Sequence, residues 1–187
     1  MKYIANNYTS ESGSGALQSD FEIFYRQLVS LLKVKNATDH LFERDLFARS
    51  WYRNLFADTD FIISQMIVRS RETEIVESSF NWAGLFNKYY RSGTDYYLDL
   101  KATKGKYYNL VVYEATDNGF SLYDMDEIDY GVFQLLQEPL SIKGLLIEMQ
   151  TYFEDDVLKN HYEVFENLIL MSIKQLVVKK AIKPFEN

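Results

Sequence analysis

Four carboxylates lie close together where a predicted strand gives way to a predicted helix: Asp124, Asp126, Glu127 and Asp129. Acidic side chains are favoured at the start of a helix because they interact with the positive end of the helix dipole. A calcium site needs several converging oxygen ligands, and the glycine-containing loop of helix–loop–helix calcium sites is missing here. The cluster is therefore interpreted as helix-start charge, with calcium binding as the alternative.

Few other residues are candidates for chemistry. The two histidines, His40 and His161, lie in different predicted helices and have no second histidine at helical spacing, so both are interpreted as ordinary histidines. The sequence contains no cysteine, no glycine-rich phosphate loop and no G-x-S-x-G nucleophile elbow. We therefore expect a noncatalytic protein with no cofactor in this chain. A Ser or Lys nucleophile that is assembled only by the fold stays open.

The composition is typical of a globular protein with an acidic surface. Hydrophobic residues make up 47% of the 187 residues, which is enough to fill a core. The net charge of -7 argues against a nucleic-acid binder, because phosphate binding needs a concentrated basic face. The polar start lacks the apolar segment of a secretory signal, and no apolar run reaches the roughly 18 residues that span a membrane. We expect a cytoplasmic protein without a membrane segment.

The N-terminal half of the sequence favours helices. Residues 1–18 are rich in Ser, Asn and Gly and are predicted to form a flexible tail. A capping box, Ser19 with Glu22, predicts that the first helix begins at Ser19 and continues to about Lys33. Together with the segments that follow, this helix defines a helical region over 19–93.

The apolar periodicity predicts two further helices in that region. A second helix is predicted from Thr38 or Asp39 to about Asp58, and another over 74–90. The apolar run 61–68 fits either a buried strand or a helix, and a helix is favoured.

After residue 93 the pattern changes to that of strands. Residues 96–100 alternate, and residues 107–115 are rich in Tyr and Val, which suit a pleated surface. The triplet 117–119 (DNG) is typical of a tight turn, and residues 120–125 continue as a strand. A β-hairpin is therefore predicted, within a sheet of two or three strands.

Three helices are predicted after the hairpin. The first begins near Asp126 and ends at Pro139, and Ser141 caps the second. The third follows Asp156 and stops before Pro184. Its predicted core face comprises Phe165, Leu168, Ile169, Ser172, Ile173 and Leu176. The predicted fold class is α+β, mostly α: an N-terminal helical region followed by a winged-helix-like unit over 94–187.

Residues 128–136 (IDYGVFQLL) and 140–146 (LSIKGLL) together resemble the helical part of PqqD-like domains, which recognise precursor peptides in ribosomal peptide-modification pathways. Residues 176–182 (LVVKKAI) are similar to the end of the last helix of that family. The resemblance covers the C-terminal half only, and the family's minimal domain has no counterpart to the N-terminal helical region.

The resemblance implies that this protein binds the leader of a precursor peptide as an added strand and presents it to a separate modifying enzyme, in a heterodimer. The chain would then be a noncatalytic accessory subunit of an enzyme complex. The implied peptide-binding residues are Phe120, Ser121, Leu122, Tyr123, Asp124 and Met125 on the strand edge, and Phe165, Leu168, Ile169 and Ser172 on the last helix. The alternative for the four helix residues is that they form the core.

Two other functions stay open. The acidic charge also fits an immunity protein that neutralises a basic toxin, because complementary charge speeds association. A winged-helix transcription regulator is the second alternative. Its recognition helix, Ser141 to Phe153, carries only Lys143 as a cation, which matches DNA poorly.

Overall fold

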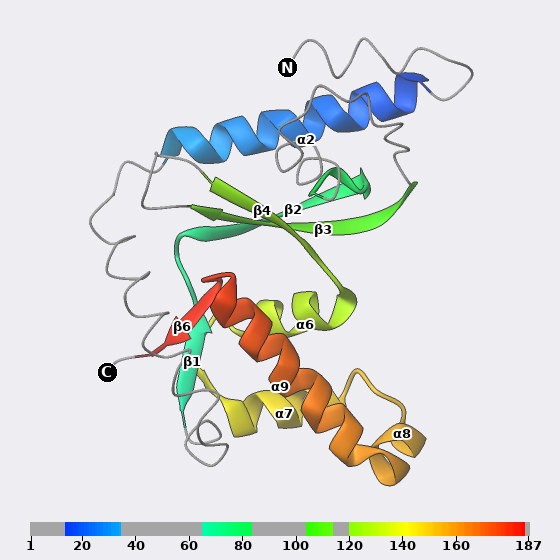
Figure 1. The fold of residues 1–187 in the computed structure, drawn as a ribbon, viewed down its shortest axis with the longest axis vertical. Helices are drawn as coiled ribbons and strands as arrows, with labels where there is room; N and C mark the ends of the chain where they lie inside the picture. Colours follow the sequence, from blue (N-terminus) through cyan, green and yellow to red (C-terminus); the bar gives the residue numbers. More distant parts are fainter. Residues whose placement is uncertain (1–13, 35–64, 84–103, 114–119, 186–187) are drawn as a thin grey trace. The chain divides into compact units, whose positions relative to one another are not determined.

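The structure is a computed structural model that describes residues 14–34, 65–83, 104–113 and 120–185 (Figure 1). These residues form five helices and two three-stranded antiparallel sheets, which confirms the predicted α+β class. The predicted helix from Thr38, the strand 96–100 and the turn 117–119 lie outside the described residues.

The chain divides into two compact units. The first unit comprises residues 1–36, 75–111 and 122–124, and the second comprises residues 37–74, 112–121 and 125–187. Each unit is held by its own buried residues, and each is described in turn.

In the first unit a long helix, α2 (Ser14–Val34), lies along a sheet with the strand order β2-β3-β4 (Figure 1). The strands are β2 (Thr73–Phe80), β3 (Lys104–Tyr113) and β4 (Phe120–Met125), of which residues 75–80, 104–111 and 122–124 belong to the first unit. β3 and β4 are the two strands of the predicted hairpin. Phe24 is buried, and the ring of Phe21 meets Trp82 edge-on at 5.1 Å between centroids. Aromatic contacts of this kind bury large areas and fix the helix to the strand ends.

A buried asparagine, Asn109, links β3 to the segment 76–83 within this unit. Its amide nitrogen donates to the carbonyl of Val76 at 2.9 Å and to the hydroxyl of Ser78 at 2.8 Å. Its amide oxygen accepts from the backbone N–H of Ala83 at 3.1 Å. Three polar groups of the segment 76–83 therefore depend on one fully buried side chain.

Three predictions for the N-terminal half were wrong. The structure has a strand, β2, where a helix was predicted to begin at residue 74. Residues 66–68 of the run 61–68 also lie in a strand, β1 (Met66–Arg69). Both strands gain their hydrogen bonds from residues far along the chain, which a local pattern does not reveal. The first helix begins at Ser14, so Ser19 is not its cap.

In the second unit the strand β1 (Met66–Arg69) lies between two short strands that come from distant parts of the chain. It pairs antiparallel with β5 (Leu140–Ser141) through Ile67 and Leu140, and with β6 (Ile182–Pro184) through Val68 and Lys183.

Four helices complete the second unit: α6 (Glu127–Leu135), α7 (Ile142–Gln150), α8 (Asp155–Asn160) and α9 (Tyr162–Val178). Their shared core is apolar and consists of Val132, Phe133, Leu136, Ile142, Leu145, Leu146, Met149, Phe165, Ile169, Ile173 and Leu176. The predicted cap of α7 is confirmed, because the hydroxyl of Ser141 accepts from the N–H of Gly144 at 2.9 Å.

The third predicted helix is two helices. His161 has a non-helical φ of -137° and separates α8 from α9, while the rings of Phe153 and Phe165 pack edge-on across this corner at 4.9 Å. The prediction that the helix continues to Pro184 was also wrong. The chain turns at Lys180 (φ 60°), whose N–H bonds to Val177 in a Schellman-type end, and β6 follows.

None of the helices in the described ranges combines the length and apolar character needed to cross a membrane.

The substitution Asn109→Ala is expected to lower the free energy of unfolding by about 3 kcal/mol, because it leaves buried donors and acceptors of the segment 76–83 unsatisfied. Urea denaturation measures the change. The matched control is Ser30→Ala, which removes an exposed hydroxyl that donates to the carbonyl of Gln27, and is expected to change stability by at most about 0.5 kcal/mol. Equal effects of the two substitutions would contradict the assigned role of Asn109.

Candidate functional site

The predicted peptide-binding strand is β4, which lies at one end of the strand order β2-β3-β4 (Figure 1). Among the described strands it pairs with β3 only. Leu122 and Met125 are buried, Phe120 and Tyr123 are half-buried, and Asp124 is exposed. Ser121, the remaining predicted residue, is also half-buried. The six residues therefore form one continuous edge strand whose side chains are partly covered on both faces.

The four predicted helix residues do not share one environment. Phe165, Ile169 and Ser172 are at most 4% exposed and belong to the core of the second unit, whereas Leu168 is 43% exposed. Burial of the first three agrees with the alternative reading of these positions as core. Leu168 is exposed, so its placement on the core face of the predicted helix was wrong.

The four carboxylates that opened the sequence analysis have separate roles. Asp126 caps α6: its side chain accepts a hydrogen bond from the N–H of Asp129 at 2.7 Å. Asp129 itself turns inward and is only 3% exposed. Asp124 and Glu127 are exposed. The interpretation as helix-start charge therefore holds for Asp126, which caps α6, and for Glu127 and Asp129, which lie in its first turn. Asp129 has a buried role as well, and Asp124 lies on β4.

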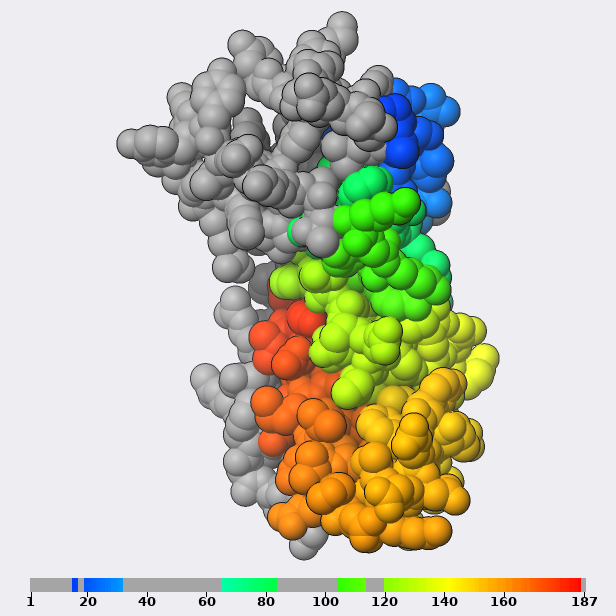
Figure 2. Space-filling model, turned by 90° about the vertical axis from the view of Figure 1, so that its right-hand side faces the viewer, coloured from blue at the N-terminus to red at the C-terminus, as the bar shows by residue number. Residues whose placement is uncertain are grey.

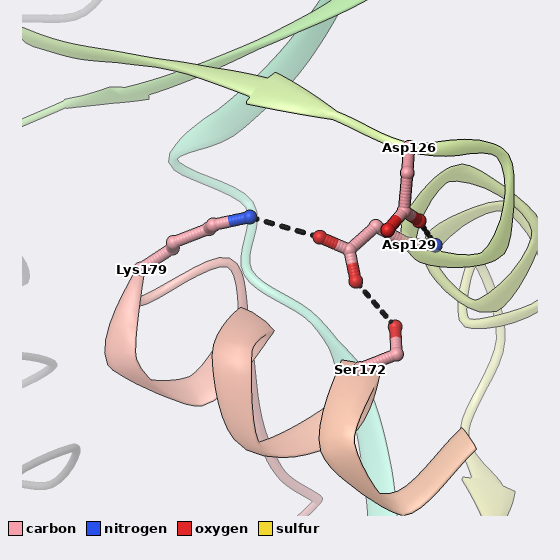
Figure 3. A network of polar contacts seen from close by, with 4 residues as sticks. All are labelled: Asp126, Asp129, Ser172 and Lys179. Carbon is pink, nitrogen blue, oxygen red and sulfur yellow. Dashed lines mark hydrogen bonds and ion pairs between the residues drawn. The ribbon is translucent and has the colours of Figure 1, made fainter. Parts of the chain in front are cut away.

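Asp129 is the centre of a buried polar network that joins α6 to α9 (Figure 3). One carboxylate oxygen, Oδ1, accepts from the hydroxyl of Ser172 at 2.6 Å, and the other, Oδ2, accepts from Nζ of Lys179 at 2.8 Å. Hydrogen bonds to charged groups are short and strong when both partners are shielded from water. Both carboxylate oxygens therefore accept hydrogen bonds, and Asp129 links α6 to α9. It is not a base that is exposed to a substrate.

A search for metal ligands among the described residues finds no group of three or more Asp, Glu or His side chains placed to hold a metal ion. Asp126 and Asp129 do not converge, since the first faces the backbone of α6 and the second faces α9.

Sequence reasoning missed the Asp129 network, although a signal was present. Asp129 shares a helical face with Val132, Phe133 and Leu136, which follow at spacings of three, four and seven residues and are all buried. A carboxylate on an apolar face needs a buried partner. Ser172, a small polar residue on the apolar face of α9, was the matching signal on the other helix.

Among the described residues, Tyr113 and Lys106 have shifted pKa values. Burial, together with the negative charge of Glu74, raises the pKa of Tyr113 to about 12. Tyr113 ends β3, and its N–H donates to the carbonyl of Glu72 at 3.1 Å. On the exposed surface, a hydrogen bond with Tyr108 raises the pKa of Lys106.

The sequence matches no protein-family model, and a search of the curated proteins found no match either. The function is therefore argued from the geometry of the described residues.

The pair Asp129 and Lys179 is expected to be strongly coupled. Asp129→Ala is expected to lower the free energy of unfolding by about 3 kcal/mol, because it leaves the Lys179 ammonium and the Ser172 hydroxyl without their partner. In a double-mutant cycle with Lys179→Ala, the combined loss should be smaller than the sum of the single losses by about 1 kcal/mol or more. Denaturant unfolding measures all three variants. Additive losses would show that the two side chains act independently, and Glu127→Ala serves as an exposed control on the same helix.

The raised pKa of Tyr113 predicts a loss of stability in alkali. The neutral phenol is favoured in the folded state, so its contribution is complete below the unfolded pKa of about 10 and is lost as the pH rises towards 12. The free energy of unfolding should therefore fall more steeply between about pH 10 and pH 12 for the natural protein than for Tyr113→Phe. Parallel pH profiles would contradict this assignment.

Proposed function

We propose that this protein binds the leader segment of a ribosomally made precursor peptide as an additional strand along β4, and presents the peptide to a separate modifying enzyme. The observation that supports the proposal is the position of β4 at the end of its sheet, where the described strands cover one edge only. An edge strand can pair with an extended peptide through backbone hydrogen bonds, and its side chains then select the peptide sequence.

The length and side chains of β4 suit such a ligand. Six residues extend over about 20 Å, so a peptide of similar length could pair with the whole strand. Phe120 and Tyr123 are half-buried, and they offer aromatic surface that a peptide side chain can contact.

In this proposal the buried helix residues Phe165, Ile169 and Ser172 contribute through the packing of the second unit. Recognition of the peptide then depends mainly on backbone pairing with β4, which tolerates different leader sequences. Specificity would come from the few side chains along β4 and from the enzyme that accepts the bound peptide.

A second candidate is a neutralising protein for a basic partner. It is favoured by exposed carboxylates at α8 and at the start of α9, namely Glu154, Asp155, Asp156 and Glu163. Association driven by these charges would weaken steeply as salt is raised, whereas pairing of strand backbones would change little. The salt dependence of binding therefore separates the two candidates.

The proposed function is tested with the leader of the short precursor encoded nearest to this protein, synthesised with a fluorescent label. Binding is measured by fluorescence anisotropy. Two further leaders carry N-methyl groups on alternate residues, one on the odd positions and one on the even positions. Strand pairing uses the N–H groups of alternate residues, so one N-methylated leader should bind at least about tenfold more weakly while the other binds like the parent.

On the protein side, Tyr123→Ser should weaken leader binding severalfold, because it removes aromatic contact area from β4. Tyr152→Ser is the matched control, since Tyr152 is 65% exposed in the second unit and is not on β4. The proposal fails if no leader binds, or if both N-methylated leaders bind as tightly as the parent.

A further inference from the structure

The sheet with the strand order β2-β3-β4 has two edges, β4 at one end and β2 at the other. The β2 edge belongs to the longer β2 strand of eight residues, whereas β4 has six. An extended peptide can pair with any edge whose backbone N–H and C=O groups are unpaired. Recognition of a peptide at one defined place therefore requires a physical difference between the two edges.

Such a difference lies near the end of β2. Asp20 on α2 accepts a hydrogen bond at Oδ1 from the backbone N–H of Ser79 at 3.0 Å. β3 runs beside this part of β2, since Nζ of Lys106 is 3.6 Å from Oε2 of Glu77. The Ser79 N–H bonds to a helix side chain instead of β3, so it belongs to the outer edge of β2. Figure 2 shows α2, in blue, at the surface beside the green strands of the first unit.

A second hydrogen bond holds the carboxylate of Asp20 in this position. Its Oδ2 accepts from the indole N–H of Trp82 at 2.7 Å, and Trp82 is only 3% exposed. The Trp82 ring in turn packs against Phe21 at 5.1 Å and Phe80 at 5.8 Å between centroids. A peptide that paired with the Ser79 N–H would displace Asp20 and take the acceptor away from the buried indole N–H. Opening the β2 edge is therefore costly.

We propose that Asp20 closes the β2 edge to extended peptides and thereby confines strand addition to β4. Asp20 is then a specificity-determining residue that decides which edge is used, without contacting the bound peptide. A carboxylate suits this role because it offers only acceptors: it occupies the edge N–H and has no donor for a peptide carbonyl. This role rests on the proposed function of β4, and it adds that each natural chain binds one leader.

Asp20 also tethers α2 to the sheet, so two variants are needed to separate closure of the edge from tethering. Asp20→Ala removes both hydrogen bonds and exposes the Ser79 N–H. Trp82→Phe removes only the indole donor, and it keeps an aromatic ring and the bond between Asp20 and Ser79. Both variants weaken the attachment of α2, whereas only Asp20→Ala opens the edge.

The first experiment measures amide hydrogen exchange of Ser79 in the full chain by NMR. In the natural protein this N–H should be protected although Ser79 is exposed. Asp20→Ala should speed its exchange at least about tenfold, and Trp82→Phe by less than about threefold. Unprotected exchange of Ser79 in the natural protein, or equal acceleration by the two variants, would overturn the proposal. The natural chain alone can fail this test, so its outcome does not depend on whether Asp20→Ala folds.

The second experiment locates the leader peptide that tests the proposed function. The leader carries a short-range diazirine cross-linker, mass spectrometry maps the residues it labels, and native mass spectrometry counts the leaders bound. The natural protein and Trp82→Phe should bind one leader and be labelled at β4. Asp20→Ala should bind a second leader and be labelled at β2 as well.

Labelling of β2 in the natural protein, or of β4 alone in folded Asp20→Ala, would contradict closure of the edge by Asp20. A natural protein that binds no leader would instead refute the proposed function of β4. The exchange of the Ser79 amide needs no leader, so it decides independently whether Asp20 occupies the β2 edge.

Discussion

The second unit depends on the burial of one charge. A carboxylate that leaves water loses several kcal/mol of solvation unless it is paired and hydrogen-bonded, so Asp129 must lie where Ser172 and Lys179 can reach it. This requirement sets the rotation of α9 about its own axis. Once Ser172 faces α6, Ile169 and Ile173 enter the core, while Leu168 stays exposed.

The first unit also contains polar side chains whose hydrogen bonds join separate segments. Asn109 is buried and bonds to three groups of the segment 76–83, while Asp20 on α2 accepts from the indole N–H of Trp82 at 2.7 Å and from the N–H of Ser79 at 3.0 Å. In both units a polar residue joins segments that are far apart in the sequence. Apolar packing alone tolerates several arrangements, whereas a satisfied buried polar group selects one of them.

The parts of the fold that were predictable are those specified by neighbouring residues. The cap at Ser141, the break at Pro139 and the helix α6 each follow from a few adjacent side chains. The strand β1 could not be found in this way, because its partners in β5 and β6 lie more than 70 residues away along the chain. The same limit applies to the candidate site. The identity of β4 followed from local alternation, but the outward orientation of Leu168 depends on the distant carboxylate of Asp129.

An edge strand such as β4, proposed here to pair with a peptide, must also avoid pairing with the same strand of another molecule. Apolar edges aggregate, and natural proteins protect them with charge and with partial cover. On β4 the exposed Asp124 supplies such a charge. The acidic net charge of -7 acts in the same direction between whole molecules. Self-association through the backbone edge is therefore disfavoured.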